Sequence, residues 1–242
     1  MKDPINMSEV ASRWLDFCAK YIFGLNGPEF IHLNLAVVGA SAQYNDLRQK
    51  HIVEANGDIP KDKMESILVT WTKSNIYNRI SVVNRLVDWV YRRPIGRALD
   101  IGCGLGHIPM FLQTSGYVRQ VVCIDHHAPM VKNARKLARK CGAKADIQHC
   151  NAGEQSFSEL YTNHFQLVTC FDSICYPDTL YPILDQVIAV CAPGGLAIFS
   201  HGSTAEWDEL ILQHLLDSGR FRYYDGHGKL GERTTIAFEK IC

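Results

Sequence analysis

The chain has 242 residues, and its 25 Lys and Arg balance 25 Asp and Glu, so its formal net charge is zero. A strong basic excess is typical of proteins that bind nucleic acid or anionic membranes, and this balance supports neither partner. With 47% hydrophobic and 21% charged residues, the composition predicts a globular protein with a buried core and excludes disordered and fibrous chains. The length predicts one large domain, or one domain with an appendage.

Targeting signals and cysteine pairs are not evident. The first residues contain neither the apolar stretch nor the small-residue cleavage site of a secretion signal, and no apolar run approaches the roughly 18 residues of a membrane helix. We therefore expect a soluble cytoplasmic protein. The nine cysteines form no CxxC pair and no compact Cys/His zinc spacing, which predicts free, reduced thiols and no metal site.

The first 92 residues have a helical pattern. Apolar residues recur at helical spacing within 8–23, 28–55 and 62–92, and Gly-Pro and Gly-Asp-Ile-Pro segments separate them. We expect a helical segment over 1–92, distinct from the remainder at 93–242.

From residue 97 short apolar runs alternate with helical patterns. The runs that predict strands are 97–101, 120–124, 146–150, 165–170 and 196–199; the helical patterns are 106–115, 128–141, 179–191 and 205–218. Strands that are apolar on both faces are typical of parallel sheets covered by helices. The alternation predicts an α/β fold with a doubly wound, mostly parallel sheet. The last two runs, 220–224 and 233–241, are joined by a Gly-rich connection and predict a C-terminal antiparallel hairpin.

A glycine-rich loop follows the first of these strands, in Leu-Asp-Ile-Gly-Cys-Gly-Leu-Gly at 99–106. A plain strand–helix turn needs one glycine, whereas three alternate glycines allow the backbone to approach a ligand. A dinucleotide loop, G-x-G-x-x-G, would place its third glycine at His107, one residue later. The loop therefore predicts a cofactor site, and its spacing weakens the dinucleotide interpretation.

The pattern Asp100-x-Gly102-x-Gly104-x-Gly106 is similar to motif I of the class I S-adenosylmethionine-dependent methyltransferases. The resemblance implies a Rossmann-like, seven-stranded sheet and S-adenosyl-L-methionine as cofactor, with Cys103 in the same loop. Asp125, at the end of the second strand, matches the acid that accepts from the ribose hydroxyls, although dinucleotide enzymes place an acid similarly. His126 matches a position that packs on the adenine.

Three further segments resemble the family in chain order. Asn151 and Ala152 follow the third strand where the family commonly has Asp-Ala; the Asn151 amide oxygen can accept the same bond from the adenine amino group. The segment from Phe171 to Tyr176 resembles motif IV, and Pro-Gly-Gly at 193–195 resembles the turn that starts the fifth strand. The resemblance covers about 97–200 and does not cover the first 90 residues.

For such an enzyme the resemblance implies in-line methyl transfer, which requires alignment of the nucleophile above all. Asp172 and Tyr176, after the fourth strand, are candidates to orient an amine or hydroxyl acceptor. His201, after the fifth strand, is the candidate base, and His126 is a weaker one. The residues after Asp172 are not the Pro-Pro pair that methyltransferases of DNA bases have at this motif, which argues against that class.

Three alternatives remain for the function of the protein. A helical cap over 1–92 predicts a small-molecule N- or O-methyltransferase. Its aromatic residues, such as Trp14, are candidates to line an acceptor pocket, with ordinary core packing the favoured interpretation for any single one. A protein or RNA methyltransferase would use those helices for docking, and a non-catalytic protein would only bind the cofactor. The basic residues within 128–141 are interpreted as a solvated face, because cations also complement a helix C-terminus. We expect a small-molecule acceptor, without nucleic acid or membrane, and leave monomer and homodimer open.

Overall fold

A computed structural model describes residues 5–25, 30–50, 61–91, 93–153, 155–173, 177–201, 205–227 and 234–242. The chain divides into two compact units, one of residues 1–92 with 139–141 and one of residues 93–138 with 142–242. Within these described ranges, no helix combines the length and apolar character that crossing a membrane requires.

The first unit is helical. It contains α1 (Met7–Phe17), the π-helix η1 (Cys18–Phe23), α2 (Phe30–Arg48), α3 (Lys61–Ser74) and α4 (Arg79–Tyr91). Trp14 is fully buried, and its indole Nε1 donates a hydrogen bond to the Ile76 carbonyl at 3.2 Å. Its ring therefore belongs to the interior of this unit, which is the interpretation that the sequence favours for any single aromatic residue.

The single helical segment predicted over 62–92 is two helices, α3 and α4, separated by a turn at 75–78. The Trp71 carbonyl accepts from the Asn75 backbone N–H at 3.2 Å, and it also accepts from the Asn75 side-chain amide and the Ser74 hydroxyl, each at 2.8 Å. Short polar side chains that bond to nearby backbone compete with the helical pattern, and this ends α3 within an otherwise apolar-periodic sequence.

The second unit is built on a seven-stranded sheet in the order β3-β2-β1-β4-β5-β7-β6. Its strands are β1 (Ile95–Ile101), β2 (Val118–Asp125), β3 (Ala145–His149), β4 (Phe165–Phe171), β5 (Cys191–His201), β6 (Phe221–His227) and β7 (Thr234–Lys240). The first five pair in parallel, whereas β7 pairs antiparallel with both β5 and β6. The predicted doubly wound sheet with a terminal hairpin is confirmed.

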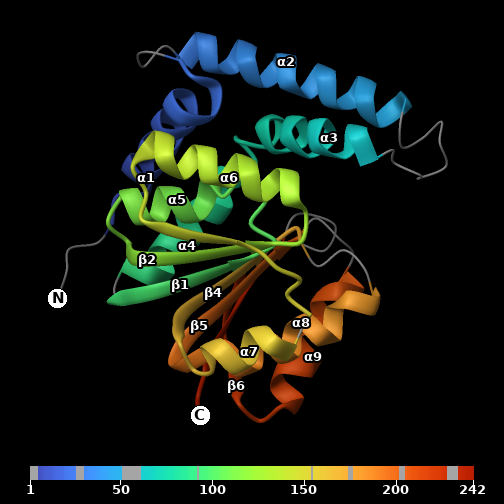
Figure 1. Ribbon diagram of the computed structural model, residues 1–242. Helices are drawn as coiled ribbons and strands as arrows, with labels where there is room; N and C mark the ends of the chain where they lie inside the picture. The colour runs from blue at the N-terminus through green and yellow to red at the C-terminus, as the bar shows by residue number, and fades with distance from the viewer. Residues whose placement is uncertain are drawn as a thin grey trace. The chain divides into compact units, whose positions relative to one another are not determined.

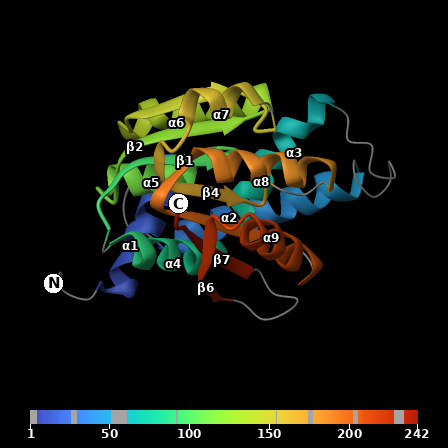
Figure 2. The same cartoon turned by 90° about the horizontal axis from the view of Figure 1, so that it is seen from below.

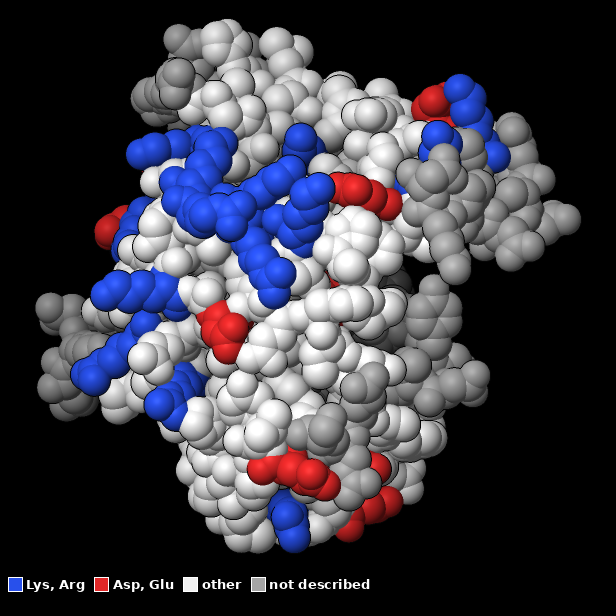
Figure 3. Space-filling model, in the orientation of Figure 1, with Lys and Arg blue, Asp and Glu red and all other residues white. Residues whose placement is uncertain are grey.

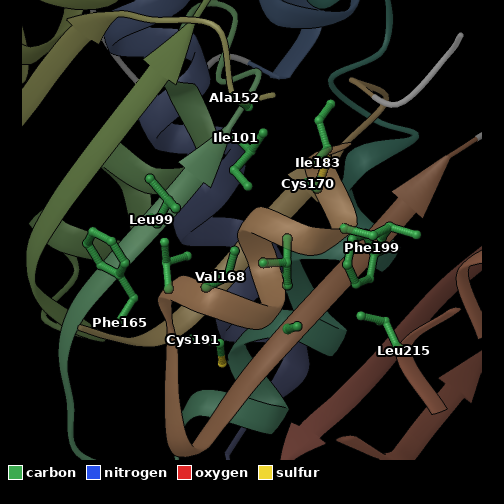
Figure 4. Packing of buried hydrophobic residues seen from close by; sticks show 14 of the residues in the cluster. Leu99, Ile101, Ala152, Phe165, Val168, Cys170, Ile183, Cys191, Phe199 and Leu215 are labelled. Atoms are coloured by element: carbon green, nitrogen blue, oxygen red, sulfur yellow. The ribbon is translucent and has the colours of Figure 1, made fainter. Parts of the chain in front are cut away.

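Helices cover both faces of this sheet (Figure 1). On one face lie α5 (His107–Thr114) and α6 (Ala128–Cys141); on the other lie α7 (Gln155–Tyr161), α8 (Pro177–Val190) and α9 (Ala205–Asp217). Figure 2 shows the same helices from below. Residues such as Leu99, Phe165 and Phe199 of the strands pack with Ile183 of α8 and Leu215 of α9 in the main core (Figure 4). This two-sided cover explains why the strands are continuously apolar.

Two details of the second unit differ from the expectation. Helix α7 was not predicted, because seven residues give too little periodicity to detect. The fifth strand begins at Cys191, so the Pro-Gly-Gly turn lies inside the strand instead of before it. The pairing between β4 and β5 shifts there, Gly194 has φ 73°, and a Cβ on Gly195 would lie 2.7 Å from the Ala192 carbonyl oxygen. The glycines therefore form a bulge within the strand.

Basic residues gather over α6 (Figure 3). The helix has no acidic residue, and its cations are Lys132, Arg135, Lys136, Arg139 and Lys140. The guanidinium of Arg135 donates to the Ile147 carbonyl of the sheet's edge strand β3, at 3.1 and 2.7 Å from its two nitrogens.

The eight described cysteines are all free thiols. Five of them are buried: Cys18, Cys103, Cys123, Cys170 and Cys191. Burial raises the pKa of the Cys191 thiol to about 12, so this thiol stays protonated at neutral pH. The prediction of unpaired thiols is confirmed for these eight, and Cys175 lies outside the described residues.

Candidate active site

The predicted site residues meet at the carboxyl edge of the parallel strands. Strand β1 lies between β2 and β4, so the chain leaves β1 toward one side of the sheet and returns on the other. Open α/β sheets bind ligands in the crevice at such a switch point. The loop after β1, the residues after β2 and the segment after β4 all belong to this edge.

The glycine loop has a left-handed backbone at Gly102 and Gly104, with φ 66° and 54°. The two glycines have different surroundings. A Cβ on Gly102 would lie 2.1 Å from the Cβ of Ser173, whereas around a Cβ on Gly104 no heavy atom of the described residues lies within 4 Å. The lack of a side chain at Gly102 therefore allows Ser173 to pack against the loop, whereas Gly104 borders open space.

The loop leads directly into α5, whose N-cap is Gly106. Gly106 also has positive φ, at 69°, and no side chain caps this helix end. The first N–H groups of a helix have no intrahelical acceptor, and the helix dipole adds positive potential there. The end of the glycine loop is therefore rich in hydrogen-bond donors.

Asp125 holds the loop from the end of β2. Its carboxylate Oδ2 accepts from the backbone N–H of Gly104 at 2.9 Å, and Oδ1 accepts from the backbone N–H of His127 at 2.8 Å. Only 7% of the residue is exposed. Each carboxylate oxygen has a second lone pair, so both can accept a further hydrogen bond from a bound ligand.

Asp100 and Cys103 are buried beneath the loop. Asp100 and Thr169 are register partners on adjacent strands, and the Thr169 hydroxyl donates to the Asp100 carboxylate. The Cys103 backbone N–H donates to the Ile124 carbonyl at 3.0 Å. A hydrogen bond with the Cys123 thiol, together with burial, raises the pKa of the Cys103 thiol well above its usual value. Both predicted residues thus have partners within the protein.

The residues predicted to contact an adenine lie beside Asp125. The His126 side chain is 79% exposed, and its backbone carbonyl accepts from Nε2 of His149 at 2.8 Å. Asn151 is exposed, and its Oδ1 accepts from the backbone N–H of Gly153 at 3.2 Å, whereas Ala152 is buried. The Asn151 oxygen predicted to accept from a ligand therefore already has one donor within its own turn.

The segment after β4 carries Asp172. Phe171 ends the strand and is buried. Asp172 has a left-handed backbone, with φ 53°, and its N–H donates to the Ser200 carbonyl of β5 at 2.8 Å. His201 is the last residue of β5, next to Ser200; its side chain lies outside the described residues, as does all of Tyr176.

Sequence reasoning missed Ser173 and His127. Ser173 fills the space left by Gly102, and the His127 N–H occupies one oxygen of Asp125. The signal for Ser173 was a small residue directly after the predicted motif IV acid, but a sequence does not show which loop it faces. In the described part of the chain, no three His, Cys, Asp or Glu side chains are grouped so that they could hold a metal ion.

Comparisons with known proteins agree with this geometry. A family model described as "Methyltransferase domain" matches residues 98–195. A ubiquinone biosynthesis O-methyltransferase of Aromatoleum aromaticum is 30% identical over 139 residues, covering 54% of this chain and 56% of the relative. A demethylmenaquinone methyltransferase of Leptospira interrogans is 26% identical over 99 residues, covering 40% and 39%. The chain thus spans about half, or less, of the curated relatives it matches.

Among solved structures, the N-methyltransferase NodS of Bradyrhizobium japonicum, in complex with S-adenosyl-L-homocysteine, superposes with a TM-score of 0.54. It is 14% identical and covers 68% of this chain and 87% of that chain. At this identity the likeness concerns the fold alone.

Proposed function

We propose that the chain is a class I S-adenosylmethionine-dependent methyltransferase, which transfers a methyl group from S-adenosyl-L-methionine to a nitrogen or oxygen of a small-molecule acceptor. The observation that carries the proposal is the glycine loop, held by the Asp125 carboxylate and open at Gly104.

The residues present fit this cofactor. The open space at Gly104 lets a ligand approach the backbone, and both Asp125 oxygens retain lone pairs for the ribose hydroxyls. His126 and Asn151 lie on the same edge and would hold the adenine. Asp100 and Cys103 would shape the loop from beneath.

When bound, the cofactor supplies a methyl group on a sulfonium, an electrophile with a good leaving group. The chain then has to align the acceptor and exclude water. We assign Asp172 to accept a hydrogen bond from the acceptor's N–H or O–H. His201, adjacent to Ser200 at the end of β5, would take the acceptor's proton, with Tyr176 as a further orienting group.

A small-molecule acceptor is supported by several independent observations. Two of the curated relatives carry quinones in their names, a ubiquinone biosynthesis O-methyltransferase and a demethylmenaquinone methyltransferase, which favours a hydroxylated or quinol-type ring. The zero net charge does not favour a polyanionic acceptor, and the free thiols suit the reducing cytoplasm. Residues 1–92 would act as the helical cap that selects the acceptor.

The cofactor assignment is tested by calorimetric titration of S-adenosyl-L-homocysteine into the wild type and Asp125→Ala. We expect binding to weaken by about 10- to 100-fold in the variant, because it loses the ribose acceptor and the bond that holds Gly104. Asp146→Ala is the control, since Asp146 is an exposed acid on β3 that accepts a hydrogen bond from the Gln148 side chain of the same strand at 2.6 Å. Absence of binding to the wild type would overturn the proposal.

The catalytic assignment is tested with a labelled methyl donor and a panel of catechol, quinol and amine acceptors. Asp172→Asn is expected to bind S-adenosyl-L-homocysteine like the wild type and to lose about 100-fold or more in turnover. Asparagine tolerates the left-handed backbone, so the change isolates the carboxylate's charge. Wild-type turnover in Asp172→Asn would remove Asp172 from the reaction.

A further inference from the structure

The side chain of Ser173 links the segment after β4 to the end of β1. Its hydroxyl donates to the Ile101 carbonyl at 2.8 Å, although the two residues are 72 apart in the chain. Its Oγ also lies 2.9 Å from the Sγ of Cys170. Because a hydroxyl has one proton, and the Ile101 carbonyl takes it, the Cys170 thiol is the donor in the second contact. Ser173 is thus held by β1 and by β4.

The contact with Ile101 depends on Gly102. Any side chain at position 102 would overlap Ser173, because the Cβ atoms would be 2.1 Å apart. The segment after β4 can therefore rest directly on the backbone of the glycine loop. Gly102 and Ser173 form one packed unit, although their sequence motifs are far apart.

Asp172 is fixed from the opposite direction. Its N–H donates to the Ser200 carbonyl of β5, whereas the residue after it is bound to β1. Between these two attachments its backbone has φ 53°, a conformation that is uncommon for residues other than glycine and persists where the surroundings impose it. The direction of the Asp172 side chain is thus set by both neighbouring strands.

We propose that Ser173 is a positioning residue: its bond to the Ile101 carbonyl fixes the Asp172 backbone and so sets the distance between the Asp172 carboxylate and the glycine loop. The inference rests on the proposed role of Asp172 in methyl transfer. Small displacements of an aligning group cost rate far more than affinity, because alignment is what the reaction requires of the protein.

The test compares Ser173→Ala with the wild type in two measurements. The first is steady-state kinetics with the acceptor that the wild type methylates best. We expect kcat to fall by about tenfold or more, with the KM values of both substrates and the Kd of S-adenosyl-L-homocysteine changing by less than about twofold. A general loss of structure would instead change these constants together with the melting temperature.

The second measurement needs no acceptor. Amide hydrogen exchange of the Asp172 N–H, followed by NMR, is expected to become about tenfold faster in Ser173→Ala, because the attachment to β1 is lost. Thr162→Ala is the matched control: it removes a hydroxyl–carbonyl bond of the same 2.8 Å length, to Ser158 on α7. The control should leave both readouts unchanged.

If Ser173→Ala is too unstable to study, Ser173→Cys replaces it, since a thiol fills the space of the hydroxyl but donates weakly. Wild-type kcat or wild-type Asp172 exchange in the folded variant overturns the inference and leaves the proposed function standing. Failure of the wild type to bind S-adenosyl-L-homocysteine would overturn the proposed function, while the exchange measurement would still report on the Ser173 contact.

Discussion

Three alternate glycines at one loop have similar backbone angles and different reasons for being glycine. The sequence predicted a cofactor loop from their spacing, and among the described residues only Gly104 of the three has open space where a Cβ would lie. Gly102 is required by Ser173 of another strand's loop. A sequence shows the spacing of residues along the chain, but it does not show which loops meet at the edge of the sheet.

This difference predicts separable effects of substitution. Gly104→Ala is expected to weaken binding of S-adenosyl-L-homocysteine by about tenfold or more, because the new methyl group enters the space proposed for the ligand. The positive φ should also cost on the order of 1–2 kcal/mol of unfolding free energy. Titration calorimetry and urea denaturation measure the two effects.

Gly142→Ala is the matched control for this change. Gly142 follows α6, has φ 71°, and also has no heavy atom within 4 Å of a Cβ among the described residues. It should lose the same unfolding free energy and keep the binding constant. Equal binding losses in both variants would show that backbone strain, and not occupied space, causes the effect at Gly104.

At the scale of elements, prediction succeeded where the burial pattern was simple. The apolar strands and α6, whose predicted bounds 128–141 match the structure, follow directly from periodicity. It failed where local polar contacts or irregular pairing decided the outcome. The break between α3 and α4 depends on the bond of Asn75, and the start of β5 depends on a bulge in its pairing with β4.

The terminal hairpin contains an ion cluster that predicts a pH dependence. Glu239 of β7 accepts from Arg222 of β6 at 2.6 Å and from Arg93 at 3.0 Å. Burial raises the pKa of the Glu239 carboxyl, but the two guanidinium groups outweigh it, and the pKa lies below its usual value of 4.5. The stabilisation is therefore fully present when the pH is above the carboxyl's unfolded-state pKa, and it is lost as the pH falls through the lower pKa of the folded state.

Glu239→Gln is accordingly expected to lower the unfolding free energy by about 1 kcal/mol at pH 7, because the charged hydrogen bonds to both guanidinium groups are weakened. The loss stays this small because Arg222 is largely exposed and solvent screens its attraction to Glu239. The difference from the wild type should shrink as the pH is lowered below 4. Urea denaturation across this range measures it. Glu209→Gln, at an exposed position of α9, serves as control, and a difference that persists unchanged in acid would exclude the ion cluster as its source.

For the whole molecule, the charge balance predicts its colloidal behaviour. The net charge is zero near pH 7, so the chain becomes net positive in acid and net negative in base. Proteins near zero net charge repel one another least. Dynamic light scattering at matched ionic strength should show the strongest self-association near pH 7 and weaker association near pH 5.5 and 9. The same association at all three values would point to a specific interface between copies.

The fold class and the order of the family motifs were accessible from sequence because each depends on local pattern. The arrangement of the first unit was less accessible: three helical segments were predicted, and Trp14 was a candidate for either a pocket or the core until its full burial placed it in the core. An aromatic residue on an amphipathic helix gives the same sequence pattern whether it lines a pocket or packs in a core.

The link between Ser173 and Ile101 also has a consequence for how the protein is made. The chain leaves the ribosome from its N-terminus, so the glycine loop is synthesised before Ser173, which packs on it and lies 72 positions after Ile101. The loop is also synthesised before the Ser200 carbonyl of β5, which accepts from the Asp172 N–H. A nascent chain that ends before β4 has the motif I sequence without the surface that supports it. The segment that carries Asp172 therefore reaches its final position late in biosynthesis, after both β1 and β5 have been made.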